Sequence, residues 1–261
     1  MPIRNNAFEI LKNGGTALGA GVRLARTVDI GKAMKTAGFD WLFIDLEHSS
    51  LSLDTAAQIS AAALDADIAP FVRVPRGEYS LATRMLDSGA LGIVMPHVET
   101  AEEAREIVAE LRLPPLGHRS YSGMNLQREY QMGSRVEATA AVEKMTMVVV
   151  MLESPSAVAE ADAIASVPGV DVVLIGTNDL CTEMGIPGEH AHPKVVEAYE
   201  KVIAACERHG KIPGAAGIDS DLMSRYIAMG SRFILAGVDL GFLIQGARAR
   251  ADFLSAAIQA K

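Results

Sequence analysis

Short apolar runs alternate along the chain with longer segments in which apolar residues recur every three or four positions. The runs are rich in valine, isoleucine, leucine and alanine, which is typical of strands buried on both faces. Several end at a proline or a polar residue, which favours a turn at that point. The pattern predicts eight strands: Thr16–Leu24, Trp41–Leu46, Ala69–Val74, Leu91–Met95, Met147–Leu152, Val170–Ile175, Ile212–Ala216 and Arg232–Ala236.

The segments between these strands have the spacing of amphipathic helices. Thr100 and Glu103 form a capping box at the start of one of them, and Gly38 fits a helix C-cap. The predicted helices are Asp29–Ala37, Leu53–Asp65, Ser80–Ser88, Thr100–Leu111, Val136–Lys144, Ser156–Val167, Lys194–Arg208, Ser220–Met229 and Leu240–Ala257, with a short turn or helix at Leu180–Met184.

Eight β/α units in succession predict a (β/α)8 barrel, because right-handed helical crossovers between parallel strands can close the sheet. The alternative is an open doubly wound sheet, but no G-x-G-x-x-G motif follows the first strand. We find no linker or low-complexity tract, so we expect residues 1–261 to form a single domain. The polar segment Pro114–Arg135 is long for a loop, and such loops are often functional.

Composition narrows the class of protein. Hydrophobic residues make up 49% of the chain and aromatic residues only 5%, which predicts an aliphatic core. The net charge of −8 argues against a nucleic-acid partner, which would require a basic patch. No apolar stretch approaches the length of a membrane span, and the N-terminus lacks the core of a signal peptide. We therefore expect a soluble cytoplasmic protein, with Cys181 and Cys206 as free thiols.

Charged residues stand where several predicted strands end. Asp45 and His48 follow the second strand, Arg73 ends the third, Glu153 follows the fifth and Asp179 follows the sixth. In a barrel these ends meet at the catalytic rim. The two acids that follow neighbouring strands, Glu153 and Asp179, suggest a binding site for Mg²⁺ or Mn²⁺, because both cations prefer oxygen ligands.

Each of these residues also has a structural interpretation. Glu153 precedes Ser154-Pro155 and could cap the next helix, whereas Asp179 follows Gly176-Thr177-Asn178, which is typical of a turn. Asp45 could hold the ring of His48.

The remaining candidate residues are an arginine, an acid and a glycine-rich turn. Arg73 interrupts an apolar strand and needs an anion, from the protein or from a substrate. Asp87 is a candidate partner in catalysis or a plain surface acid. Gly214-Ala215-Ala216-Gly217 permits close approach of a small ligand or tight packing. We expect Gly176, Thr177 and Ala215 to contact the substrate.

Six segments in order resemble the HpcH/HpaI aldolases, which are class II pyruvate aldolases. The resemblance extends from about Leu18 to Ile244. The segments are Gly38-Phe39-Asp40-Trp41-Leu42-Phe43-Ile44-Asp45-Leu46-Glu47-His48, Val72-Arg73-Val74-Pro75, Leu86-Asp87-Ser88-Gly89-Ala90, Pro114-Pro115-Leu116-Gly117-His118-Arg119, Met151-Leu152-Glu153-Ser154 and Ile175-Gly176-Thr177-Asn178-Asp179-Leu180.

The resemblance implies a modified TIM barrel with a divalent metal (Mg²⁺, Mn²⁺ or Co²⁺) on Glu153 and Asp179 and no organic cofactor. It implies that Arg73 contacts a 2-oxo acid and that His48, held by Asp45, serves acid–base chemistry. It also implies a hexamer, a trimer of dimers, in which the last helix is exchanged between subunits. Met151 is a departure, because many members have glutamine at this position.

The expected activity is the reversible cleavage of a 4-hydroxy-2-oxo acid to pyruvate and an aldehyde through a metal-stabilised enolate. No lysine occurs at a predicted catalytic strand end, which argues against a Schiff-base aldolase. The alternatives are a citrate-lyase-like enzyme acting on a CoA thioester, an oxaloacetate decarboxylase, an enzyme of phosphoenolpyruvate chemistry, and a barrel that binds a metal or an oxo acid without catalysis.

Overall fold

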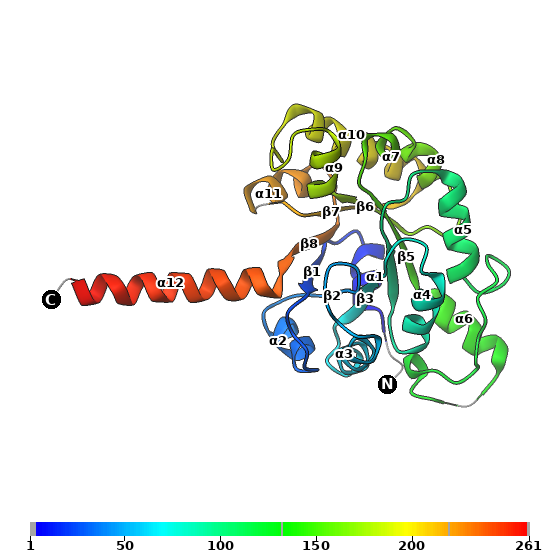
Figure 1. The fold of residues 1–261 in the computed structure, drawn as a ribbon. Coiled ribbons are helices and arrows are strands. Elements are labelled where there is room, and N and C mark those ends of the chain that lie inside the picture. Colours follow the sequence, from blue (N-terminus) through cyan, green and yellow to red (C-terminus); the bar gives the residue numbers. More distant parts are fainter. Residues whose placement is uncertain (1–3, 132, 219, 260–261) are drawn as a thin grey trace.

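Eight parallel strands close into a barrel in the computed structural model, which confirms the predicted fold class. The strands pair in sequence order, and β1 pairs with β8 to complete the ring (Figure 1). They are β1 Ala17–Val22, β2 Trp41–Asp45, β3 Ala69–Arg73, β4 Gly92–Met95, β5 Met147–Leu152, β6 Val172–Gly176, β7 Ile212–Ala216 and β8 Phe233–Val238. The structure describes residues 4–131, 133–218 and 220–259. Residues 1–3, which belong to the N-terminal segment compared with a signal peptide, and position 132 of the predicted loop lie outside the described residues.

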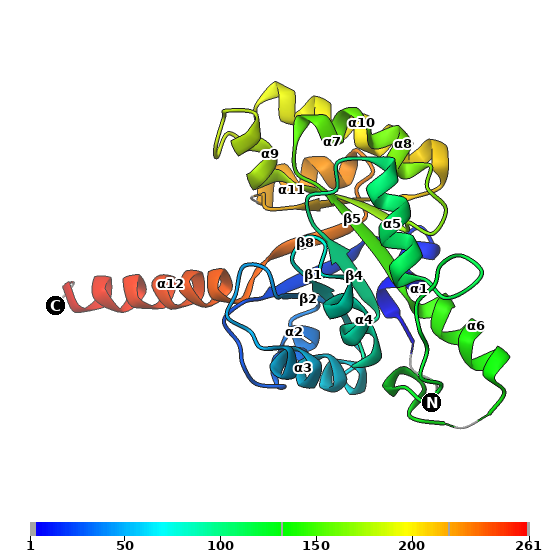
Figure 2. The ribbon, with the colours of Figure 1, turned by 45° about the vertical axis from the view of Figure 1, so that its right-hand side comes forward.

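Most of the helices surround the barrel on its outer face, whereas α1 lies at one end of it and α12 projects away from it (Figures 1 and 2). They are α1 Asn6–Lys12, α2 Ile30–Thr36, α3 Leu53–Asp65, α4 Tyr79–Asp87, α5 Ala101–Leu111, α6 Arg135–Met145, α7 Pro155–Ala159, α8 Ala161–Ala165, α9 Thr177–Glu183, α10 Pro193–His209, α11 Ser220–Ala228 and α12 Asp239–Gln259, with a 3-10 turn η1 at Leu126–Arg128. None of the described helices is long and apolar enough to span a membrane.

Three helices differ from the prediction. The predicted helix Ser156–Val167 is divided at Glu160 into α7 and α8. The helix predicted at Leu180–Met184 begins earlier, directly after β6, which places Asp179 in its first turn. Helix α1 was not predicted; the side chain of Asn5 caps it by accepting a hydrogen bond from the backbone N–H of Phe8.

Side chains of each strand alternate between the barrel interior and the layer under the helices, because successive residues of a strand point to opposite faces. The interior at the N-terminal end is packed with Trp41, Phe71 and Phe233, which are fully buried. Ala7 and Leu11 of α1 belong to the same cluster and close this end of the barrel. We call this part the floor, and the end where the strands finish the mouth.

Helix α12 leaves the barrel after β8 and extends away from it in both views (Figures 1 and 2). Among the described residues of this helix only Asp239 is buried. Its exposed large apolar side chains are Leu240, Leu243, Ile244, Phe253, Leu254 and Ile258. At the start of the helix Phe242 stacks on Phe39 with ring centroids 5.6 Å apart, but the six exposed apolar side chains stay uncovered in the described part of one chain.

Candidate active site

Polar side chains replace apolar ones at the mouth, two residues beyond the last inward-facing apolar side chain of the same strand. Asp45 and Arg73 each follow an inward-facing phenylalanine in this way, and Glu153 follows an inward-facing methionine. Because side chains alternate along a strand, all three point into the barrel. Asp45 is opposite Arg73 in the pairing of β2 with β3.

The mouth encloses a cavity of about 450 Å³. This volume lies within the range of small-molecule sites. Most of the residues predicted for the site line it: His48, Arg73, Glu153, Gly176, Thr177 and Asp179. The structure thus brings together side chains from β2, β3, β5 and β6 and from the loops that follow them.

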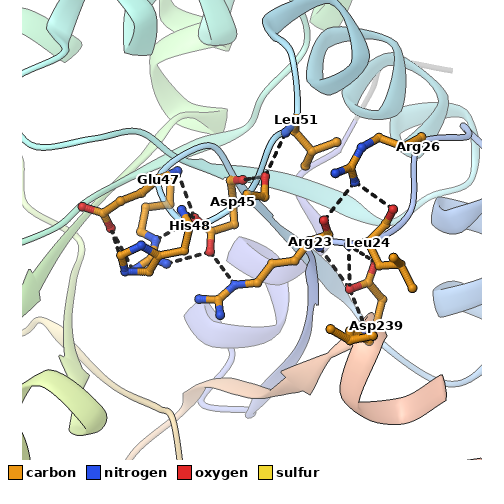
Figure 3. A network of polar contacts seen from close by, with 11 residues as sticks. Arg23, Leu24, Arg26, Asp45, Glu47, His48, Leu51 and Asp239 are labelled. Atoms are coloured by element: carbon orange, nitrogen blue, oxygen red, sulfur yellow. Dashed lines mark hydrogen bonds and ion pairs between the residues drawn. The ribbon is translucent and has the colours of Figure 1, made fainter. Parts of the chain in front are cut away.

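Asp45 is fully buried and binds two arginines, Arg73 and Arg23, and Figure 3 shows its bond to Arg23. Its carboxylate accepts hydrogen bonds from Nε and Nη2 of Arg73 at 3.0 and 2.6 Å and from Nε of Arg23 at 2.6 Å. The backbone N–H groups of Glu47 and His48 donate to it at 3.1 Å. Burial would raise the pKa of Asp45, but its bonds and attraction to Arg73, with smaller contributions from His48 and Arg23, lower it to about 2. The carboxylate is therefore charged at neutral pH.

Glu47 and His97 connect Arg73 to Glu153. Nη1 of Arg73 lies 3.0 Å from Oε2 of Glu47, and Nε2 of His97 lies 3.6 Å from Oε1 of Glu47. On its other side His97 donates its backbone N–H to Oε2 of Glu153 at 2.9 Å, with Nδ1 3.2 Å from the same oxygen. His97 adopts φ +52°, an unusual conformation for a residue other than glycine. This conformation accompanies the contact of both its backbone and its ring with one carboxylate oxygen.

Glu153 is a buried carboxyl group with one free oxygen. Its side chain is 2% exposed, and Oε1 has no hydrogen-bond partner among the described residues. Burial raises the pKa of Glu153 to about 8; the N–H of His97 and the charge of Arg73 oppose the rise, and the charge of Asp179 adds to it. An unpaired buried oxygen beside a second carboxylate favours a bound cation, which would satisfy the oxygen and screen the repulsion.

The donor set fits a hard divalent cation that retains water or substrate oxygens. Glu153 and Asp179 both line the cavity. The described residues contain no group of three or more His, Cys, Asp or Glu side chains placed to hold a metal. Mg²⁺ is commonly bound by only one or two carboxylates together with water and substrate, whereas a closed zinc site requires more protein ligands. The residues present therefore fit Mg²⁺ or Mn²⁺ better than a structural metal.

One expectation about contacts at the mouth requires correction, and the bonds of Thr177 limit how its hydroxyl can contact a substrate. Asp45 does not hold the ring of His48: it accepts a hydrogen bond from the backbone N–H of that residue, and the ring lies 3.8 Å from Glu47. The hydroxyl of Thr177 is bonded to the carbonyl oxygen of Ala216 and to the hydroxyl of Tyr199, so this hydroxyl is committed to the protein. Thr177 lines the cavity without a free hydroxyl.

Two further residues that were predicted for the site, Ala215 and Asp87, lie away from the cavity. Ala215 points into the layer under the helices, and Ala216 and Gly217 line the cavity instead, because the prediction was displaced by one residue on a strand whose side chains alternate. Asp87 is the last residue of α4, which runs back from the mouth toward the start of β4. Within one chain its charged neighbour is Arg119, and burial raises its pKa.

Sequence reasoning assigned no role to Arg23, Glu47 or Asn178, which all belong to the mouth. Arg23 and Asn178 line the cavity, and Glu47 pairs with Arg73. The signal for Arg23 was its spacing: it stands two residues after Gly21, on the inward side of β1. Asn178 is held by His190, whose Nε2 lies 2.9 Å from its Oδ1.

Comparison with known proteins gives a consistent result. The family described as HpcH/HpaI aldolase/citrate lyase matches residues 24–246. A protein of Hapsidospora irregularis named 4-hydroxy-4-methyl-2-oxoglutarate aldolase is 42% identical, and the alignment covers 87% of this chain and 86% of that protein. A hydroxypyruvate/pyruvate aldolase of Roseovarius nubinhibens is 34% identical, with 95% and 96% of the two chains covered.

A solved structure matches the fold over nearly the whole chain. The crystal structure of an HpcH/HpaI aldolase from Desulfitobacterium hafniense superimposes with a TM-score of 0.90 at 29% identity, and the match covers 95% of each chain.

Proposed function

The chain belongs to the HpcH/HpaI aldolase/citrate lyase family, and we propose that it is a divalent-metal-dependent aldolase. Its substrate is a 4-hydroxy-2-oxo acid, which it cleaves reversibly to pyruvate or a related 2-oxo acid and a second carbonyl compound. Relatives named as aldolases of pyruvate and of 4-hydroxy-4-methyl-2-oxoglutarate support the aldolase activity. Metal dependence rests on the mouth of the barrel.

The observation that carries the proposal is the meeting of opposite charges in one cavity. Glu153 supplies a buried, unpartnered carboxylate oxygen, and Asp179 lies beside it in the first turn of α9. Arg73 faces the same cavity from β3. Glu153 and Asp179 would hold a divalent cation, which supplies a Lewis acid for an oxygen that becomes negative during the reaction.

Cleavage breaks the bond between C3 and C4 of the substrate. The electron pair of that bond remains with the pyruvate fragment as an enolate, while the 4-hydroxyl group loses its proton and becomes the carbonyl of the second product. A proton then adds at C3 to give the methyl group of pyruvate. The protein must therefore stabilise a negative oxygen and move two protons.

The chain's own residues provide these functions. Asp45 and Glu47 hold Arg73 in one orientation, so its charge is already aligned when the enolate forms. Because no reorganisation of the protein is then needed, the negative enolate oxygen is stabilised more strongly. His48 lines the cavity, and its side chain is 48% exposed, so it can exchange protons with solvent. We assign it the proton transfers at the 4-hydroxyl and at C3.

Proton exchange at the methyl group of pyruvate tests this function without knowledge of the second substrate. The protein is freed of metal, then supplied with Mg²⁺ or Mn²⁺ in D₂O, and loss of the methyl signal is followed by NMR. We expect exchange only with metal, and its loss in Glu153→Gln and Asp179→Asn. Metal-bound protein that exchanges no methyl proton would refute the proposal and favour a CoA-thioester lyase or a non-catalytic barrel. Oxaloacetate decarboxylation uses the same enolate and is measured in parallel.

We also propose that the chain forms a hexamer, a trimer of dimers, by exchange of α12 between partner subunits. The support is the apolar surface that α12 leaves exposed in the described part of one chain. Light scattering after gel filtration measures the mass. We expect a hexamer for the full chain and smaller species when Leu243 and Phe253 are both replaced by serine. A full-length chain that remains monomeric at micromolar concentration would contradict the proposal.

A further inference from the structure

The cavity has a second cationic side chain on the wall opposite the proposed metal site. Glu153 follows β5, whereas Arg23 follows β1. Three strands separate β1 from β5 in either direction around the ring, so these two residues lie on opposite sides of the mouth. The cavity of about 450 Å³ leaves room beyond a three-carbon acid, and a longer substrate held at Glu153 extends toward Arg23.

Arg23 keeps most of its hydrogen-bonding capacity for a ligand. Its Nε donates to Asp45, but neither outer nitrogen of its guanidinium has a partner among the described residues (Figure 3). Its side chain is 37% exposed and lines the cavity. Arg73 differs, because Nε and Nη2 are bonded to Asp45, Nη1 is paired with Glu47 and its side chain is 3% exposed. An incoming anion therefore finds free donors on Arg23.

The loop that carries Arg23 is fixed before any ligand binds. The backbone N–H groups of Arg23, Leu24 and Ala25 donate to the carboxylate of Asp239, the first residue of α12, at 2.7–3.1 Å (Figure 3). Nη1 of Arg26 donates to the carbonyl oxygens of the same three residues. Because both sides of this backbone are bonded, little ordering is left for binding to accomplish.

The surroundings of Arg23 favour an anionic group at this point. The neighbouring cavity wall consists of Phe43, Leu235, Gly237 and Val238, which are apolar or small. Of the two acids that line the cavity, Glu153 follows β5 on the opposite side, and Asp179 follows the neighbouring strand β6. The outer nitrogens of Arg23, left free beside the bond from its Nε to Asp45, match the two oxygens of a carboxylate.

We propose that Arg23 binds a second carboxylate of the substrate, at the end remote from the 2-oxo acid. The substrate class is then a 4-hydroxy-2-oxo acid with a carboxylate at each end, and the carbonyl compound released with pyruvate carries a carboxylate of its own. This assignment rests on the proposed aldolase function and adds the recognition of the second fragment to it.

A matched pair of substrates tests the assignment. The pair is 4-hydroxy-2-oxoglutarate and 4,5-dihydroxy-2-oxopentanoate, which release glyoxylate and glycolaldehyde and differ at the far end by carboxylate against hydroxymethyl. Pyruvate formation is followed by NMR. In the wild-type protein we expect the dicarboxylate to have the higher kcat/KM. Arg23→Met lowers that value about 10- to 100-fold, mainly through KM, as expected for loss of hydrogen bonds to a charged group. Arg23→Lys retains part of the preference.

Comparison of the two substrates removes the indirect effect of Arg23 on Asp45, because that effect alters both reactions alike. Arg76→Met is the control: Arg76 stands in the turn after β3, is 53% exposed and pairs with Glu103, and it does not line this cavity. We expect an unchanged substrate ratio in this variant. An equal fall of the ratio in Arg76→Met would overturn the assignment and attribute the preference to the general field of the rim.

Methyl exchange of pyruvate separates failure of the assignment from failure of the function. Exchange in the wild-type protein together with equal kcat/KM for the two substrates would overturn the role of Arg23 and leave the aldolase intact. A preference for the dicarboxylate that persists in Arg23→Met would do the same. Absence of both exchange and cleavage would refute the aldolase function and this inference with it.

Discussion

The floor and the mouth of the barrel are built from the same strands but from opposite kinds of side chain. At the floor, the ring of Trp41 stacks on Phe233 at 3.9 Å between centroids and meets the edge of Phe71 at 5.4 Å. At the mouth, Asp45 and Arg73 lie on β2 and β3, the strands of Trp41 and Phe71. Their side chains are as deeply buried as those of the aromatic residues. Apolar burial stabilises the fold, whereas buried charges require partners to offset their desolvation. This barrel therefore separates the residues that stabilise it from the residues of its chemistry along its axis.

Replacing Arg73 should produce the largest effect, because it is the cation on which the mouth's carboxylates depend. For Arg73→Met we expect metal binding to persist and the rate of methyl exchange to fall about 100- to 1,000-fold, as on removal of a preorganised electrostatic partner. Stability should fall by about 3 kcal/mol, because a buried ion pair loses one member.

The double variant Arg73→Met with Asp45→Asn provides the control. Removal of the buried charge that has lost Arg73 and retains Arg23 should restore part of the stability and none of the activity. A single variant with wild-type exchange would show that Arg73 takes no part in the reaction. Equal stability of Arg73→Met and the wild type would show that the mouth does not depend on this ion pair.

Trp41→Ala should be the next largest change, and it should affect stability alone. Trp41 is fully buried in the aromatic cluster of the floor, so truncation leaves a cavity and should cost about 3–5 kcal/mol in chemical denaturation. The exchange rate per folded molecule should stay within about twofold of the wild type, since additivity holds between distant sites. Loss of exchange in the folded protein would show that the two ends of the barrel are coupled.

The fold could be predicted from the sequence because strands β2 to β6 are buried at every position, which leaves continuous apolar runs. The boundaries that could not be predicted depend on tertiary contacts. Helix α1 is short, and the sequence gives no sign that Ala7 and Leu11 close the floor. The bend at Glu160, between α7 and α8, likewise has no proline or glycine to mark it.

The site was predicted where position along a strand was sufficient and missed where pairing across strands was required. Strand-end residues such as Glu153 and Arg73 could be found because parallel strands finish at one edge. The contact of His97 with Glu153 depends on a backbone conformation with positive φ, and the bond from Arg23 to Asp45 joins neighbouring strands. Ala215 was placed wrongly because an error of one residue along a strand turns the side chain to the other face of the sheet.

Acid should weaken the mouth before it weakens the floor. Folding lowers the pKa of Asp45 from its ordinary 3.8 to about 2, so its ion pairs contribute stability that is complete above about pH 4 and is lost as the pH falls through 2. The contribution is about 2 kcal/mol, at about 1.4 kcal/mol per pKa unit. We expect the stability difference between the wild type and Asp45→Asn to narrow between pH 4 and pH 2.

Asp162→Asn is the matched control for this measurement, because Asp162 is an exposed acid paired with Arg208. Its effect should be small at every pH, since surface ion pairs contribute little. A difference between the wild type and Asp45→Asn that stays constant down to pH 2 would show that Asp45 is not the titrating group of the mouth.

Glu153→Gln should have the smallest effect on stability, and that effect should have the opposite sign. In the metal-free protein the pKa of Glu153 is raised to about 8 from its ordinary 4.5, so the stability associated with its protonated form is complete below pH 4.5 and is lost as the pH rises through 8. Glutamine resembles the protonated acid and does not titrate. The variant should therefore gain about 1–2 kcal/mol over the metal-free wild type at pH 9, less than the full ~1.4 kcal/mol per pKa unit because solvent enters the open mouth.

The same substitution removes a metal ligand, so Mn²⁺ should raise the Tm of the wild type and not that of the variant. A substitution that stabilises the empty protein and abolishes its response to metal would show that Glu153 is retained for binding at the expense of stability; a variant that still responds to Mn²⁺ would remove Glu153 from the metal site.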